Sequence, residues 1–556
     1  MLDSTDLSDE SQNRRKQNVT ALSAGAVAIF ICLFGNLGAI GLVGPDEPRY
    51  AWIARAMAET GDWVTPRLYG QPWFEKPILY YWAAAVGFRS HLSPEVAARL
   101  PSAFAALAAA IAIGWLAWNH YGGENGFVRS SAFLAPLIFS TSVAAIGFAR
   151  AATPDMLFGA SIALAMACAA TVLRRAGVFR SLEPPEHRAR PPLALIFFGA
   201  WLGVAVLAKG PAAILLAGGA IVLWALATKN WRAGFRLLHP LAIAGFCVVA
   251  LPWYVLCALR NAEFLHVFII EHNFERYLTP VFMHRQPFWF FGPIVLLALL
   301  PWTALLCPAA QEGLSLWREK SWSDSPGFFF ACWAVFPVLF FSFSQSKLPG
   351  YILPAIPPLA LLLAVALERA TRTGTGRAGL ILSAVGVTWI AIGFTAIIWA
   401  YRMPVGMRED LGAAIFALSV IGAAGGILIV ALALFRRRSP LTVSFFLVVI
   451  VVLFAGARLL PSLDPYVSAG PHAALMQHDL RPDRIFTYHL RRSWTYGLAF
   501  YMRRELPEWS PHDPEPALVL TSPAGLDELR RLGRFQGVLD ETYRGILFVP
   551  VRPAPR

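Results

Sequence analysis

Apolar runs of about twenty residues recur along this chain and constrain its fold more than any other feature. Hydrophobic residues occupy 57% of the 556 positions, and charged residues only 15%. Because unpaired backbone groups are costly in lipid, such runs predict transmembrane helices. We count thirteen candidate spans, at 21–43, 97–118, 131–149, 155–173, 193–208, 211–227, 238–259, 287–307, 327–343, 351–368, 378–400, 411–435 and 440–460. The sequence therefore predicts a polytopic α-helical membrane protein.

The first predicted loop, 44–96, contains one apolar segment that is too short to cross a membrane. This segment, PILYYWAAAVGFRSHL at 77–92, is rich in aromatic residues. Aromatic side chains favour the boundary between lipid and water. We therefore expect a helix that lies at the membrane surface.

Charge placement predicts how the chain is oriented. The polar tail 1–20 precedes a first apolar run that lacks a clear cleavage site, so we interpret the run as a span with a cytoplasmic tail before it. Successive spans place their loops on alternate sides of the membrane. Four basic loops then lie in the cytoplasm, as the positive-inside rule expects: 174–180, 229–236, 369–377 and 436–438. The loop 44–96 and the chain after 460 would lie on the external side.

The composition changes at about residue 461, which divides the predicted membrane domain 21–460 from a C-terminal domain at 461–556. The patterns RIFTYHL, PALVLTSP and GILFVPV are typical of strands, and LDELRRLG is typical of a helix. A small external α/β domain is expected here.

Two global features exclude other classes. The net charge of +13 comes mainly from loop residues beside the membrane, and no nucleic-acid motif accompanies it. The six cysteines lie in or beside apolar runs without metal-ligand spacing, so we interpret them as small core residues.

Several polar residues at the ends of spans are predicted to face the same external side. They are Asp46, Glu47, Arg49 and Tyr50 after the first span, Glu75 and Lys76 in QPWFEKP, Asp155 in ATPD, Lys209 in AKGP, His272 and Arg276 in EHNFERY, and Lys347 and Tyr351 in SKLPGY. Each group has a structural alternative, such as a helix cap, a local ion pair or a snorkelling lysine. Their occurrence on one side, next to prolines that fix the turns, favours a shared cavity.

The residue types indicate a chemistry for that cavity. A carboxylate can orient or deprotonate an acceptor, or stabilise a positive sugar carbon. Lysine and arginine can bind a phosphate and offset its charge as it leaves. No Gly-rich phosphate loop, HExxH motif or Ser-His-Asp signature is present. The pattern favours transfer from a lipid-linked phosphate donor over ATP-driven transport or proteolysis.

The motifs DEPRY, AETGDWVTPRLYGQPWFEKPILYYW, AKG, EHNFERY and SKLPGYILP resemble the bacterial aminoarabinose transferases that modify lipid A. More broadly they resemble the protein O-mannosyltransferase-like superfamily with the GT-C membrane fold. The resemblance runs from about residue 21 to 370. It departs at Pro154, where relatives often have an apolar residue, and in the short C-terminal domain.

The resemblance implies an inner-membrane enzyme that faces the periplasm, with surface helices at 50–60 and 77–92 in its first loop. It implies an undecaprenyl-phosphate-linked 4-amino-4-deoxy-L-arabinose donor and a lipid A phosphate acceptor. Asp46 would be the leading catalytic carboxylate, and Glu75 and Asp155 would orient the cations or contact the sugar.

The remaining motif residues would contact substrate under this resemblance. Arg49, Lys76 and Lys347 are candidates for the donor or acceptor phosphate. The further substrate-contact candidates are Glu47, Tyr50, Lys209, His272, Arg276 and Tyr351. No motif demands a cofactor, and a divalent cation between Asp46 and the acceptor stays open.

Three alternatives remain at this point. The acceptor could be a protein, a hopanoid or a polysaccharide in place of lipid A. The chain could be a lipid or polysaccharide transporter, which predicts charges at mid-span. It could also be a non-catalytic assembly partner that uses its external domain.

Overall fold

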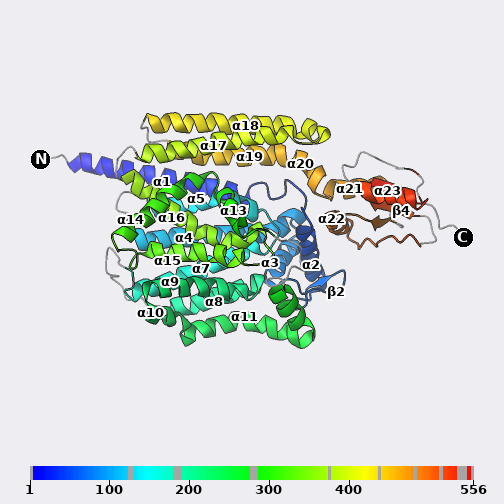
Figure 1. Ribbon diagram of the computed structural model, residues 1–556, viewed down its shortest axis with the longest axis horizontal. Coiled ribbons are helices and arrows are strands. Elements are labelled where there is room, and N and C mark those ends of the chain that lie inside the picture. The colour runs from blue at the N-terminus through cyan, green and yellow to red at the C-terminus, as the bar shows by residue number, and fades with distance from the viewer. Residues whose placement is uncertain are drawn as a thin grey trace.

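The computed structural model describes most of the chain, and it is a bundle of helices with a small α/β unit at one end (Figure 1). The described residues are 4–122, 130–179, 191–275, 286–372, 377–435, 440–479, 485–512, 517–534, 537 and 547–551.

Nine helices in these ranges are long and apolar enough to cross a membrane. They are α1 (Ser4–Phe34, apolar from Lys16), α4 (Pro94–Tyr121), α7 (Asp155–Arg175), α8 (Pro191–Lys209), α11 (Pro240–Arg260), η6 with α16 (Pro349–Ala355 and Ile356–Arg372), α17 (Arg377–Tyr401), α18 (Val405–Leu434), and α19, η7 and α20 in series (Pro440–Phe454, Ala455–Leu459 and Leu460–Val467). The predicted multi-pass helical fold class is confirmed.

Two bent pairs raise the number of candidate spans to eleven. The first joins α5 (Ser131–Ser140) to α6 (Val143–Ala149) at 59°, and the second joins η4 and α13 (Phe288–Phe290 and Phe291–Ala298) to η5 and α14 (Trp302–Leu305 and Leu306–Arg318) at 109°. The apolar helices α9 (Ala212–Thr228) and α15 (Pro326–Ser342) are shorter. Each of the thirteen predicted spans overlaps one of these helices or pairs, but the predicted number exceeds the nine to eleven that length and composition support.

The bends have local causes that hydropathy does not register. At the first bend, the Thr141 hydroxyl donates to the Leu137 carbonyl, and the Ser142 hydroxyl accepts from the Ala145 N–H at 3.4 Å to cap α6. Hydroxyls that bond the backbone in this way compete with helix continuation. At the second bend, Pro301 lacks the N–H that a continuous helix needs.

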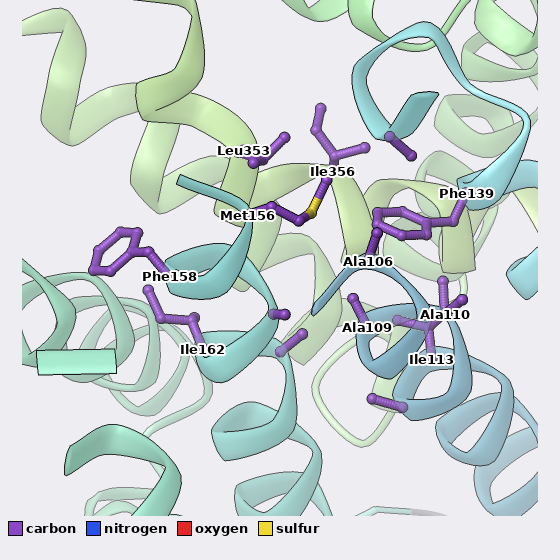
Figure 2. Packing of buried hydrophobic residues seen from close by; sticks show 14 of the residues in the cluster. Ala106, Ala109, Ala110, Ile113, Phe139, Met156, Phe158, Ile162, Leu353 and Ile356 are labelled. Atoms are coloured by element: carbon purple, nitrogen blue, oxygen red, sulfur yellow. The ribbon is translucent and has the colours of Figure 1, made fainter. Parts of the chain in front are cut away.

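The centre of the bundle is packed from α4, α5, α7 and the η6–α16 helix (Figure 2). Small residues on α4 face larger side chains of its neighbours. Figure 2 labels Ala106, Ala109, Ala110 and Ile113 of α4 together with Phe139, Met156, Phe158, Ile162, Leu353 and Ile356. Alanine at a helix crossing lets two backbones approach closely, which favours dispersion contacts in a lipid environment where hydrophobic driving force is weak.

Helices α8 and α11 show the closest backbone approach of this kind. A Cβ added to Gly199 would lie 1.7 Å from the carbonyl oxygen of Ala242, and one added to Gly245 would lie 2.4 Å from the carbonyl oxygen of Ile196. Gly199 and Gly203 are four positions apart, which is the spacing of glycine-mediated helix pairs in membranes. The crossing therefore requires glycine.

We expect the substitution Gly199→Ala to destabilise the protein by about 1–3 kcal/mol, because the added methyl must push α8 away from α11. Thermal unfolding of the purified protein in detergent measures this effect. Gly218→Ala on α9 is the matched control, since among the described residues no atom outside its own stretch of helix lies within 4 Å of the position that its new methyl group would take. Equal unfolding temperatures for the two variants would contradict the proposed crossing.

The loop 44–96 folds against one end of the bundle (Figure 1). It contains α2 (Asp46–Thr60), the antiparallel strands β1 (Arg67–Leu68) and β2 (Gln71–Pro72), and α3 (Leu79–Arg89). The Tyr80 hydroxyl donates to the Ala98 carbonyl at 2.8 Å, and the indole N–H of Trp82 donates to the Trp63 carbonyl at 2.8 Å. These bonds fix the loop to α4 and to itself. The short segments α10 (Trp231–Phe235), η2 (Arg236–Leu238) and the π-helix η3 (His266–Glu275) flank α11.

The C-terminal part forms a three-stranded sheet in the order β3-β4-β5 with helices beside it. Its elements are α21 (Gly470–Asp479), β3 (Ile485–Tyr488), α22 (Arg492–Met502), β4 (Ala517–Thr521), α23 (Pro523–Arg531) and β5 (Leu547–Val551). Strands β3 and β4 are parallel, and β4 and β5 are antiparallel. The three predicted strand patterns coincide with these strands. Helix α23 begins earlier than the LDELRRLG pattern because the Ser522 hydroxyl caps it.

One tyrosine links this C-terminal unit to the membrane part. The Tyr501 hydroxyl on α22 accepts a hydrogen bond from the Leu42 N–H at 2.8 Å and donates to the Glu95 carboxylate at 2.7 Å. Leu42 follows the first span and Glu95 starts α4. The unit therefore contacts both segments that flank the first loop.

Candidate functional site

A cavity of about 730 Å³ lies where the first loop meets α7, α8 and the η6–α16 helix. Its polar lining includes Asp46, Tyr50, Glu75, Lys76, Asp155, Lys209, His272 and Tyr351, together with Thr153 and Ser344. Its apolar wall includes Phe148, Phe158, Leu215, Phe268, Phe340 and Phe341. Eight predicted site residues from distant segments thus line one space.

The first loop supplies an ionic cluster to this cavity. Arg49 donates to the Asp46 carboxylate at 2.5 Å and lies 2.9 Å from the Glu75 carboxylate, which also pairs with Lys76 at 3.2 Å. The Asp46 side chain is 49% exposed, whereas that of Glu75 is 11% exposed. Asp46 is therefore the carboxylate of this cluster that is open to a ligand.

Local sequence explains the geometry of the cluster. Asp46 and Arg49 lie on the first turn of α2, where i and i+3 side chains share a face. Burial lowers the pKa of Arg49, but the adjacent Glu75, Tyr50 and Asp46 outweigh burial and leave the pKa above its usual value. Arg49 thus stays charged and fixes the direction of Asp46. Tyr50 is buried, with its ring edge-on to Tyr80 and Tyr81 at 6.1 Å.

A second ion pair on the cavity joins Asp155 to Lys209. Asp155 is the first residue of α7 and Lys209 the last of α8, so each charge also opposes the helix dipole at its own end. The Lys209 ammonium lies 4.9 Å from the centre of the Tyr351 ring and 5.7 Å from that of Phe158. The pair brings the TPD, AKG and SKLPGY motifs together.

Glu47 is positioned differently from the other predicted residues. Its carboxylate accepts from Arg99 at 2.7 Å, from the Val43 N–H at 2.8 Å and from the Ala152 N–H at 2.8 Å. It is not part of the cavity lining. These bonds hold the turn before α2 against α4 and the start of α7, which is a structural role, and the predicted substrate contact of Glu47 stays a prediction.

Sequence reasoning missed Arg99, the partner of Glu47. Besides that carboxylate, its guanidinium donates to the carbonyls of Leu37, Ile40 and Gly41 at 2.6–2.9 Å. The available signal was an arginine inside a predicted apolar span, which is costly in lipid unless it has partners.

The last predicted residues divide into three cases. His272 on η3 lines the cavity. Lys347 is buried and donates to the carbonyls of Gln286 at 3.0 Å and Ser344 at 2.6 Å, and burial lowers its pKa. Lys347 stabilises the turn beside the cavity and is not part of the cavity lining. Arg276 lies outside the described residues.

This arrangement suits an amphiphilic ligand with a phosphate. The cations can bind the anionic group, and the phenylalanines can contact an apolar chain. Among the residues that the structure describes, no three His, Cys, Asp or Glu side chains gather to hold a metal ion. A divalent cation at Asp46 would therefore need part of its coordination from other groups.

Comparison with solved structures identifies the architecture. The chain superimposes on ArnT from Cupriavidus metallidurans, solved bound to undecaprenyl phosphate, with a TM-score of 0.77 and 24% identity, over 97% of this chain and 99% of that one. The fold is the GT-C fold. An archaeal oligosaccharyltransferase, AglB from Archaeoglobus fulgidus, shares it more distantly, with a TM-score of 0.50 and 11% identity over 96% of this chain and 74% of that one.

Sequence comparison agrees with this GT-C assignment. Residues 19–268 match the family described as dolichyl-phosphate-mannose-protein mannosyltransferase. The undecaprenyl phosphate-alpha-4-amino-4-deoxy-L-arabinose arabinosyl transferase of Edwardsiella ictaluri is 32% identical over 59% of this chain and 56% of that protein. The enzyme of the same description from Aeromonas salmonicida is 32% identical over 64% of this chain and 62% of that protein.

The resemblance predicted from the motifs is thereby confirmed. The alignments span little more than half the length of these relatives. The match to residues 19–268 includes DEPRY, EKP, the start of α7 and AKG, whereas SKLPGY lies beyond it.

Proposed function

We propose that this protein is an inverting glycosyltransferase that moves 4-amino-4-deoxy-L-arabinose from undecaprenyl phosphate to a phosphate of lipid A. The observation that carries this proposal is the cavity itself, where an exposed Asp46 lies among cations and next to an apolar wall. The names of the relatives support the sugar and its carrier, since one was solved with undecaprenyl phosphate and others are named for aminoarabinose transfer.

The reaction requires one bond to form as another breaks. An acceptor phosphate oxygen attacks the anomeric carbon, and the bond from that carbon to the polyprenyl phosphate breaks with inversion. The electron pair leaves with the undecaprenyl phosphate. Because an ionised phosphate needs no deprotonation, we assign Asp46 to orienting the acceptor and stabilising the positive sugar carbon.

The cations of the site would act on the phosphates. Lys76 lines the cavity and can bind the donor phosphate, offsetting its charge as it leaves. Lys209 pairs with Asp155 and lies over the Tyr351 ring, where it can contact the acceptor phosphate. Glu75 and Asp155 hold these two lysines in position, and Arg49 holds Asp46. The apolar wall would receive the polyprenyl chain.

The proposed setting is the bacterial inner membrane with the cavity on the periplasmic side. The basic loops 174–180 and 229–236 support this orientation, because positive loops favour the cytoplasm. The division into membrane residues 21–460 and a periplasmic domain at 461–556 belongs to the same proposal. A periplasmic site also fits a lipid-linked donor, since nucleotide sugars are confined to the cytoplasm.

Transfer by the purified protein tests the proposal directly. The protein in detergent is given undecaprenyl-phosphate aminoarabinose and lipid A, and mass spectrometry follows both lipids. We expect lipid A to gain the mass of one aminopentose and the donor to become undecaprenyl phosphate. Consumption of the donor with release of free sugar and no change in lipid A would indicate transfer to water, and the same measurement in membranes would then test for another acceptor, such as a protein or polysaccharide. An intact donor under conditions where the protein is folded would contradict the enzyme assignment.

A further inference from the structure

Helix α22 of the C-terminal unit lies beside α2 of the first loop (Figure 1). Tyr496 and Phe500 are four positions apart, so they lie on the same face of α22. The centre of the Tyr496 ring is 5.5 Å from the guanidinium carbon of Arg49. The centre of the Phe500 ring is 4.3 Å from the guanidinium carbon of Arg55. The C-terminal unit therefore contacts α2 through two arginine–ring pairs, and the first of them involves the arginine that pairs with Asp46.

The ion pairs of Arg49 attach it through one nitrogen atom. Its Nη2 atom lies 2.5 Å from the Asp46 carboxylate and 2.9 Å from the Glu75 carboxylate. Its Nε atom is buried and has no hydrogen-bond acceptor among the described residues. Because both carboxylates bind the same nitrogen, they do not by themselves fix the plane of the guanidinium group.

Aromatic rings supply a further restraint on this plane. The guanidinium carbon of Arg49 lies 5.3, 5.4 and 5.5 Å from the ring centres of Tyr50, Trp73 and Tyr496. A guanidinium group within about 6 Å of a ring face is attracted to it, and the attraction is stronger where water is excluded. The Arg49 side chain is only 10% exposed. Tyr50 and Trp73 belong to the first loop, and Tyr496 is the ring that the C-terminal unit contributes.

Tyr496 lies behind the reaction cavity, at one remove from it. Neither Tyr496 nor Arg49 is part of the cavity lining, whereas Asp46 is. An effect of the Tyr496 ring on a ligand in this cavity would therefore pass through Arg49 to Asp46.

The attachment of α22 to the membrane part does not depend on Tyr496 alone. Arg55 donates to the Phe500 carbonyl at 3.0 Å, and the Tyr501 hydroxyl bonds both segments that flank the first loop. These contacts persist when Tyr496 is replaced. Loss of the Tyr496 ring should therefore change the geometry at Arg49 more than it changes the attachment of the C-terminal unit.

We propose that Tyr496 is a positioning residue for transfer, whose ring holds the Arg49 guanidinium in the plane that orients Asp46. This inference rests on the proposed transfer function and deepens it, because it gives the C-terminal unit a part in the geometry of the reaction. The unit would raise the transfer rate without contacting the reacting atoms.

The kinetic test compares Tyr496→Leu, which removes the ring, with Tyr496→Phe, which keeps it. We expect a kcat about tenfold lower for the leucine variant and an unchanged kcat for the phenylalanine variant. Both KM values should stay within twofold of wild type, because the restraint acts on the transition state and not on substrate binding. Tyr496→Met is a second ring-free variant for the case that Tyr496→Leu does not fold.

Phe486→Leu is the matched control for this comparison. It removes another partly buried ring of the C-terminal unit, one that packs with the sheet. Thermal unfolding in detergent should show a similar stability for this variant and for Tyr496→Leu. Equal kcat values for the two leucine variants would overturn the proposal. An equal loss of kcat in Tyr496→Phe would also overturn it, because the hydroxyl and not the ring would then be responsible.

A double-mutant cycle shows whether the ring acts through Arg49. When Tyr496→Leu is added to Arg49→Met, the residual kcat should change by less than twofold, since the ring has no guanidinium left to hold. A further tenfold loss in this background would contradict the proposed route.

A measurement without donor or acceptor separates this inference from the proposed reaction. In the full-length protein in detergent, Asp46→Cys places a thiol beside Arg49, and a charged alkylating reagent reports its reactivity. Cys307→Ser removes the exposed native thiol, and the other five cysteines lie within apolar helices. A guanidinium group held next to a thiol lowers its pKa and raises the reactive thiolate fraction.

We expect alkylation at position 46 to be about threefold slower at pH 7 when Tyr496→Leu is added, and unchanged when Tyr496→Phe is added. This result should appear whether or not the wild type transfers sugar. Equal alkylation rates in the leucine and phenylalanine backgrounds would show that the ring does not position Arg49, and would overturn the proposal.

Discussion

Asp46→Asn is expected to lower the transfer rate by on the order of a thousandfold while the protein still folds and inserts. Asparagine keeps the shape of the side chain, so it can still accept from Arg49. It removes the negative charge that would orient the acceptor and stabilise the sugar carbon. Initial rates with labelled donor in membranes measure this effect.

Asp527→Asn is the matched control for this substitution. Its carboxylate is 65% exposed on α23, where it forms an i,i+3 pair with Arg530. We expect full activity from this variant. If Asp46→Asn kept wild-type activity at equal membrane abundance, Asp46 could not be the leading carboxylate of the site.

Arg99→Met is expected to destabilise the protein by about 3–5 kcal/mol, because it leaves the Glu47 carboxylate buried without its charged partner. The side chains of Arg99 and Glu47 are 3% and 10% exposed, and their contact is 2.7 Å. Three backbone carbonyls before α2 would also lose a donor. Thermal unfolding in detergent measures the change.

Two further variants make this prediction specific. Arg530→Met removes a side chain that is 53% exposed, together with its surface interactions such as the pair with Asp527, and should change stability by less than about 1 kcal/mol. Adding Glu47→Gln to Arg99→Met should recover part of the lost stability, because it removes the buried, unpaired charge. Unfolding temperatures of Arg99→Met that equal those of Arg530→Met would show that the buried pair does not stabilise the turn.

The membrane helices could be predicted because spanning lipid imposes a length and a composition on each run. Each of the thirteen predicted runs overlaps a helix or a bent pair. The bends at Ser142 and Pro301 were not predicted, because neither residue interrupts the apolar run. A hydropathy pattern records which residues enter lipid, whereas a bend depends on which backbone groups find partners.

The candidate site could be predicted in part for a related reason. Asp46 and Asp155 begin helices, Lys209 ends one and Lys76 lies in the first loop, and predicted sidedness alone places all four on one face. Their actual pairing, with Asp155 opposite Lys209, depends on helix packing between distant segments. The ion pair of Glu47 with Arg99, which is 52 positions further along the chain, could not be predicted from the DEPRY motif. The roles of these residues in transfer remain predictions.

The hydrogen bonds of Tyr501 bear on how this protein can change over evolutionary time. Leu42, which donates to the tyrosine, stands four residues before Asp46, and Gly41 donates to Asp464 at 2.8 Å. The acidic turn and the C-terminal unit are therefore not independent modules. A lineage that exchanged its C-terminal unit for another would also have to supply a new partner for the Leu42 backbone, so we expect these two parts of the chain to have been inherited together.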